Sequence, residues 1–81
     1  MPSAPTKLDL QFAAYLKKRR AGMSFADFSK ETGLNGSTLF RIEQGEMSIT
    51  LKKLNLVLVR LNTSLAEVFG DVAKKKFTRR D

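Results

Sequence analysis

Residues 24–45 read SFADFSKETGLNGSTLFRIEQG, and this stretch contains the start and stop signals of two short helices. Ser24 is suited to cap the first helix, and Gly33 is suited to end it after about eight residues. Asn35 can cap a second helix over 36–44. Two short helices joined by so few residues cannot lie antiparallel, so we expect them to meet at a steep angle, as in a helix-turn-helix.

Helix signals continue on both sides of this segment. Apolar spacing predicts a helix over 8–20, capped by Thr6 or Asp9. Caps and apolar periodicity predict a fourth helix over 51–61 and a short fifth helix over 65–70. No segment alternates apolar and polar residues for long enough to predict a strand. The expected fold is therefore all-α, a compact five-helix domain.

The chain divides into three parts. Residues 1–7 contain two prolines and small polar side chains and are expected to form a flexible arm. Residues 8–70 are expected to form the helical domain. Residues 71–81 carry five basic side chains and are expected to form a flexible tail. This tail is either a solvated terminus or an auxiliary contact to phosphates.

Composition limits the function. The 81 residues include 15 Lys and Arg against 8 Asp and Glu, a net charge of +7 that indicates nucleic acid or an anionic membrane surface as the partner. Basic and apolar residues do not share one long amphipathic helix, which disfavours a membrane. With no Cys or His, the chain cannot form a zinc site of the usual kind or a nucleophile activated by histidine. We therefore expect that the protein binds no cofactor or metal and is not an enzyme. Without a secretory signal, the protein is expected to be cytoplasmic.

The expected helix 36–44 has an outer face suited to the major groove of DNA. Small residues at its start allow close approach to the bases. Serine can hydrogen-bond a base edge, and arginine can bond both acceptors of guanine, worth ~1–3 kcal/mol of discrimination. The candidate base-reading residues are Asn35, Gly36, Ser37, Phe40 and Arg41.

The run TLFRIEQG at 38–45 and the stretch Leu65 to Phe69 carry a more specific signal. Together with the caps they resemble the Cro/C1 (Xre) family of helix-turn-helix repressors, over roughly residues 8–70. The resemblance implies a lambda-repressor-like domain that acts as a homodimeric bacterial or phage transcription regulator. Phage repressors and restriction-modification controller proteins are such regulators.

Some positions depart from the family pattern. Phe25 stands where the family often has a glutamine that supports a phosphate contact, and Gly36 stands where a side chain often reads a base. The family's arginine near the end of the first helix corresponds to Lys17 or Lys18. The candidate phosphate-contacting residues are Lys17, Lys18, Ser24, Phe25, Thr38, Gln44 and Ser48.

Three residues of this segment have open interpretations. Phe40 either contacts a thymine methyl group, or packs on a neighbouring helix or at a dimer contact. Arg41 either enters the groove or pairs with Glu43 or Glu46. An acid facing DNA would repel phosphates, and the place of Glu43 in the family pattern implies a structural role instead, in which it bonds loop amides or a basic residue of the first helix.

The fourth helix is more apolar than a one-sided helix requires. Leu51 is expected on its buried face, whereas Leu56 and Val59 project from nearly the opposite side. These two residues are either exposed singly or form a dimer contact with Phe69. A dimer would place two reading helices about 34 Å apart, one turn of DNA.

The leading hypothesis is a sequence-specific double-stranded DNA-binding regulator. It would act as a repressor or autoregulator, as a homodimer on a two-fold symmetric operator, by blocking a promoter or contacting RNA polymerase. The alternative is the antitoxin of a toxin–antitoxin pair, which binds both DNA and a protein toxin.

Overall fold

The computed structural model describes residues 4–70, so residues 1–3 and the whole expected tail 71–81 lie outside this part. Of the expected arm 1–7, Thr6 caps the first helix and Lys7 is already its first residue. Residues 65–70 are helical, and no strand occurs among residues 4–70. The predicted all-α fold with five helical segments is confirmed. The first four segments are α1 (Lys7–Arg20), α2 (Phe25–Thr32), α3 (Gly36–Glu43) and α4 (Leu51–Arg60).

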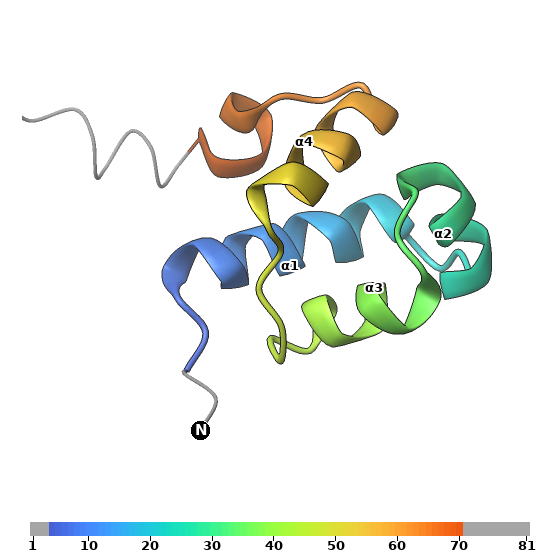
Figure 1. The fold of residues 1–81 in the computed structure, drawn as a ribbon, viewed down its shortest axis with the longest axis horizontal. Coiled ribbons are helices and arrows are strands. Elements are labelled where there is room, and N and C mark those ends of the chain that lie inside the picture. The colour runs from blue at the N-terminus through green and yellow to red at the C-terminus, as the bar shows by residue number, and fades with distance from the viewer. Residues whose placement is uncertain (1–3, 71–81) are drawn as a thin grey trace, which may run out of the picture.

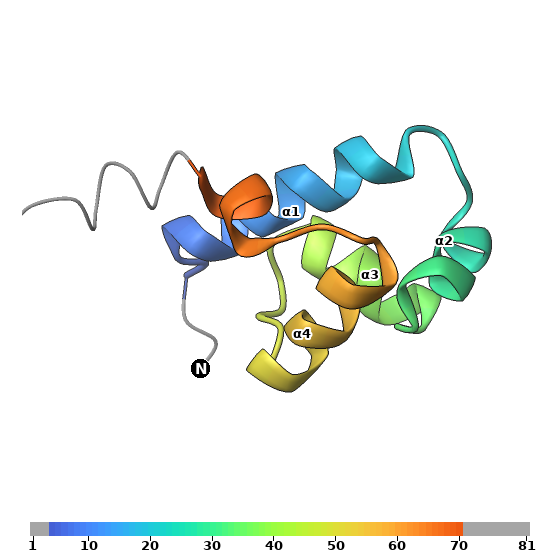
Figure 2. The same ribbon diagram turned by 90° about the horizontal axis from the view of Figure 1, so that it is seen from above.

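In Figure 1, α1 crosses the middle of the domain, with α3 below it, α4 and the segment 65–70 above it, and α2 beyond its C-terminal end. Figure 2 shows that α3 and α4 both lie to the same side of α1, whereas the segment 65–70 lies over α1. Every helical segment contributes to a single apolar core. The buried members of this core are Phe12, Leu16, Phe28, Leu34, Leu39, Ile42, Val57, Leu61 and Val68.

Side-chain caps begin the helices where the sequence predicts them. At the start of α1, the Asp9 amide donates to Thr6 Oγ1 at 3.1 Å, and the Thr6 amide donates to the Asp9 carboxylate at 2.8 Å. Both candidate residues therefore take part in one capping box. Helix α1 ends at Arg20, and its C-cap residue Ala21 lies in the left-handed region at φ 46°. The other caps are Ser24, Asn35 and Thr50.

The turn between α2 and α3 is fixed from both sides. Gly33 adopts φ +84°, and a Cβ atom there would lie 3.1 Å from Leu56 Cδ2 of α4. On the inner side, the fully buried Thr32 accepts a hydrogen bond at Oγ1 from the Leu34 amide at 3.2 Å. The steep angle expected between the two helices therefore depends on contacts with the rest of the domain.

A bidentate ion pair joins the end of α1 to the end of α3. Arg20 Nε and Nη2 donate to the two carboxylate oxygens of Glu43 at 2.8 and 2.9 Å, and the Glu43 side chain is only 1% exposed. Arg20 Nη1 donates to the carbonyl of Met23 at 3.0 Å. The hydrogen bonds with Glu43 raise the pKa of Arg20, which keeps the guanidinium charged. The expected structural role of Glu43 is confirmed, with Arg20 as its partner.

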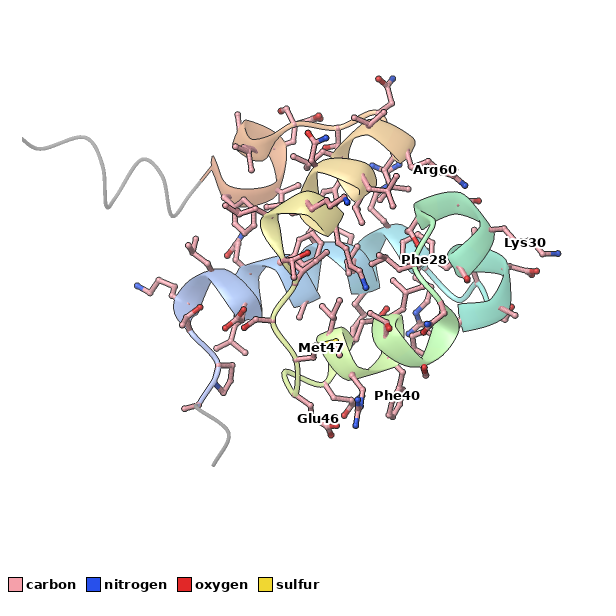
Figure 3. The ribbon with its side chains drawn as sticks, in the orientation of Figure 1. Phe28, Lys30, Phe40, Glu46, Met47 and Arg60 are labelled. Atoms are coloured by element: carbon pink, nitrogen blue, oxygen red, sulfur yellow. The ribbon has the colours of Figure 1, made fainter. Side chains whose placement is uncertain are left out.

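Two further arginines bind carbonyl groups near helix ends. Arg60 of α4 donates to the carbonyls of Lys30 and Glu31 at 2.7 and 3.2 Å, and Figure 3 shows Arg60 next to the helix that carries Lys30. Arg19 donates to the Leu61 carbonyl at 3.1 Å. Carbonyls in the last turn of a helix lack partners within the helix and carry partial negative charge, so these cations stabilise the packing of the helices.

Replacing Thr32 by valine tests the turn, because valine keeps the side-chain shape but lacks the oxygen that binds the Leu34 amide. We expect Thr32→Val to lower the free energy of unfolding by about 1–3 kcal/mol, the cost of a buried amide without a partner. Urea unfolding followed by circular dichroism measures this loss. Thr32→Ser keeps the oxygen and is the control; a larger loss for serine than for valine would contradict the assignment.

Breaking the ion pair from one side should cost more than removing it entirely. Arg20→Met leaves a buried Glu43 carboxylate without a partner, so we expect a clearly lower urea midpoint than in the wild type. The double variant Arg20→Met, Glu43→Leu removes both charges and should recover part of the lost stability. Additive losses from the two substitutions would show that the residues do not depend on one another.

Candidate nucleic-acid interface

The outer face of α3 brings most of the candidate base-reading residues together. Ser37, Phe40 and Arg41 are exposed and lie three and four positions apart, so they share one side of the helix. Phe40 projects from this side, away from α1 and α4 (Figure 3). Asn35 is exposed just before the helix, and Gly36 is its half-buried first residue.

Asn35 and Ser37 are linked to each other at the start of this face. Asn35 Oδ1 accepts from the Thr38 amide at 2.8 Å and from Ser37 Oγ at 2.9 Å. The Asn35 side chain thus orients the Ser37 hydroxyl. The Ser37 oxygen can still accept hydrogen bonds and the Asn35 amide nitrogen can still donate them, which gives this corner both types of polar group.

Arg41 is exposed one turn further along α3. Within residues 4–70, the one ion pair joins Arg20 and Glu43. Neither Glu43 nor Glu46 therefore pairs with Arg41 in the described part of the chain. The guanidinium of Arg41 lies on the same face as Ser37, and its charge is available to an external partner.

Phe25 and Phe40 form an aromatic cluster between α2 and α3. Their ring centroids are 5.7 Å apart with an interplanar angle of 82°, an edge-to-face arrangement. The Arg20 guanidinium carbon lies 4.1 Å from the centroid of the Phe25 ring. Phe40 nevertheless keeps 47% of its surface exposed. Phe40 thus packs on a neighbouring helix, one of the alternatives stated above, and also presents a ring to solvent.

The candidate phosphate-contacting residues lie in several different settings. Lys17 and Lys18 are exposed in the last turn of α1, and Gln44 is exposed at the end of α3. Ser24 caps α2 by accepting from the Asp27 amide at 3.0 Å. Thr38 is half-buried, and its amide donates to Asn35.

Ser48 has a partner within the chain. Its hydroxyl donates to Asp9 Oδ1 at 2.7 Å and connects the loop after α3 to the start of α1. Hydrogen bonds from the Thr6 amide, and then from Ser48, lower the pKa of Asp9. A contact between Ser48 and phosphate would therefore place the phosphate near a charged carboxylate.

The three candidate dimer residues differ in exposure. Val59 is 68% exposed on α4, whereas Leu56 is 38% exposed and lies against Gly33. Phe69 is half-buried and stacks on Phe12, with ring centroids 6.1 Å apart and an interplanar angle of 23°. Val59 is thus the member of the set that packs least against its own chain.

An apolar groove was missed by the sequence analysis. It has a volume of about 680 Å³ and lies between the start of α1, the start of α4 and the segment 65–70. Leu8, Leu51 and Leu65 line it and are 46%, 83% and 55% exposed. The expectation that Leu51 is buried is wrong, because it is the first residue of α4 and extends beyond the core. The sequence signal for this groove was the presence of leucines, such as Leu8 and Leu65, at positions that the helical core does not require.

Residues 4–70 contain neither a membrane-spanning helix nor a cluster of metal-ligating side chains. No helix there is long and apolar enough to cross a membrane. No group of three or more acidic or other metal-ligating side chains among residues 4–70 is placed to hold a metal ion.

Similarity to solved structures supports the fold. The chain is similar to the wild-type restriction-modification controller protein C.Esp1396I at 24% sequence identity and a TM-score of 0.67, over 91% of this chain and 99% of that one. It is also similar to the clp gene regulator ClgR from C. glutamicum at 22% identity and a TM-score of 0.67, over 86% and 92% of the two chains. A comparison with curated proteins gives no match.

The sequence itself matches a family model described as helix-turn-helix over residues 14–68, more than half of the chain. This match includes α2, α3 and the turn between them, the elements that carry the exposed face described above. The chain therefore belongs to the Cro/C1-type helix-turn-helix family of DNA-binding transcription regulators.

Proposed function

We propose that this protein is a sequence-specific regulator of transcription that inserts α3 into the major groove of double-stranded DNA. The observation that carries the proposal is the outer face of α3, where Ser37, Phe40 and Arg41 are exposed together. The helix beneath them is held by the buried pair of Arg20 and Glu43. A rigid helix with exposed polar and apolar side chains on one face is what direct reading of base edges requires.

The base-reading role is divided along α3. Asn35, Gly36 and Ser37 form the narrow N-terminal end, which can approach the bases closely, and Ser37 and Asn35 offer an acceptor and donors. Arg41 follows one turn later and can bond both acceptors of a guanine. Phe40 lies between them and offers an apolar surface.

Phosphate contacts supply affinity and not sequence preference. We assign this role first to Lys17, Lys18 and Gln44, which are exposed beside the reading face. Ser24 and Thr38 lie in the first turns of α2 and α3, where backbone amides can bind phosphate. Phe25 contributes by packing, and Ser48 would have to share its hydroxyl with Asp9.

The regulator acts as a homodimer in the cytoplasm of a bacterium, on a two-fold symmetric operator with half-sites about 34 Å apart. The exposed Val59 and the neighbouring Leu56 on α4 form the dimer contact. A bound dimer that overlaps a promoter would repress transcription, including that of its own gene, and one beside a promoter could contact RNA polymerase.

Base reading and phosphate binding can be separated by substitution. After selection of a preferred duplex from random sequences, Arg41→Ala should weaken binding to that duplex by about 5- to 150-fold and relax the preference at one base pair. Lys18→Ala is the matched control, and it should weaken binding to all duplexes alike. It should also reduce the steepness with which the logarithm of the binding constant falls against the logarithm of the salt concentration, by about one. Fluorescence anisotropy across a salt series measures both. An equal loss on all sequences for Arg41→Ala would contradict its role.

The dimer contact is tested at its most exposed residue. Val59→Glu should shift sedimentation from dimer to monomer without changing the urea midpoint, because Val59 is 68% exposed in the single chain. Leu65→Glu is the control, because Leu65 is also an exposed aliphatic residue, at 55%. A dimer that survives Val59→Glu would remove this contact and leave the face free for another protein, such as the toxin of the antitoxin alternative.

A further inference from the structure

Phe40 is unusual on α3 because its ring is exposed and also packs against a second aromatic ring, that of Phe25. It keeps 47% of its surface exposed although it lies between the polar residues Ser37 and Arg41. Figure 3 shows it projecting from the outer side of the helix. Its position is not set by the core, since it is absent from the buried cluster.

A chain of contacts leads from the ion pair to this ring. Glu43 binds the edge of the Arg20 guanidinium, with hydrogen bonds of 2.8 and 2.9 Å. The carbon of the same guanidinium lies over Phe25, 4.1 Å from the ring centroid. Phe25 then meets Phe40 edge to face at 5.7 Å. The Phe40 ring therefore has a packing partner on α2 that is itself in contact with the ion pair.

Only certain groups on DNA can be recognised by such a ring. A phenyl group donates and accepts no conventional hydrogen bonds, so it cannot read the polar edges of the bases. In the major groove of unmodified DNA, the C5-methyl group of thymine is the apolar feature of a base-pair edge, and phenylalanine is among the side chains that contact it.

We propose that Phe40 reads the C5-methyl group of one thymine in each half-site, and that Phe25 and Arg20 are positioning residues that fix its ring. This inference rests on the proposed function, since it requires α3 to lie in the major groove. It adds a specific chemical determinant to that function: the operator must carry a methyl group at one defined position, next to the base pair read by Arg41.

Uracil substitution tests the inference without altering any hydrogen-bonding group of the base. In the selected duplex, each thymine is replaced in turn by deoxyuridine, which lacks only the methyl group. For the wild type we expect about fourfold weaker binding at one position per half-site, the factor for losing one buried methyl-sized group. Phe40→Ala should bind the thymine and uracil duplexes equally, and Phe40→Leu should keep part of the difference.

Phe25→Leu tests the positioning role. Leucine keeps apolar volume against α3 but removes the ring that meets Phe40, so the ratio of uracil to thymine dissociation constants should fall towards one. A thermal melt checks that each variant is folded. A purely structural role of Phe25 would lower the melting temperature and leave this ratio unchanged, which would overturn the positioning assignment.

The outcomes separate the inference from the proposed function. If the wild type prefers its selected duplex but tolerates uracil at every position, the methyl inference is overturned and the proposed function stands. If Phe40→Ala retains the uracil penalty, the effect arises from DNA shape and the inference is again overturned. If no duplex is preferred over random DNA, the proposed function fails and the inference fails with it.

Discussion

The bidentate pair of Arg20 and Glu43 is the interaction that joins the end of α3 to the rest of the domain. One guanidinium binds the end of α3 through Glu43, the loop after α1 through the Met23 carbonyl and the start of α2 through the ring of Phe25. A carboxylate with 1% exposure is costly without such a partner. Through these contacts the pair links the end of α3 to the end of α1 and to the start of α2.

The positive charge of the chain serves two purposes. Arg19, Arg20 and Arg60 bind carbonyls or a carboxylate within the domain and hold helices together. Lys17, Lys18 and Arg41 are exposed, and these are the residues assigned here to DNA. The net charge of +7 belongs to the whole chain. Within residues 4–70, fewer cations are available to phosphates than the number of Lys and Arg residues suggests, because three arginines already bind groups of the domain. The five basic residues of the tail lie outside that part.

Local signals in the sequence predicted the elements well, because caps and left-handed glycines act within a few residues. Asn35 and Gly33 determined the limits of α3 and α2 to within one residue. Contacts between distant segments were harder to predict. No signal near Arg20 in the sequence identifies it as the partner of Glu43, 23 positions away. Likewise, no local signal places Leu56 against Gly33. The exposed residues of α3 were identified from helical spacing, but the role of Phe25 in packing against Phe40 required the structure.

We propose above that the outer face of α3 is the surface that meets DNA. Nuclear magnetic resonance on the ¹⁵N-labelled protein can locate that surface, by titration with the selected duplex and with an unrelated duplex of equal length. We expect amide shifts specific to the selected duplex to concentrate at residues 35–41, with little change at the groove residues Leu8, Leu51 and Leu65. Specific shifts centred on the groove, with α3 unaffected, would contradict it.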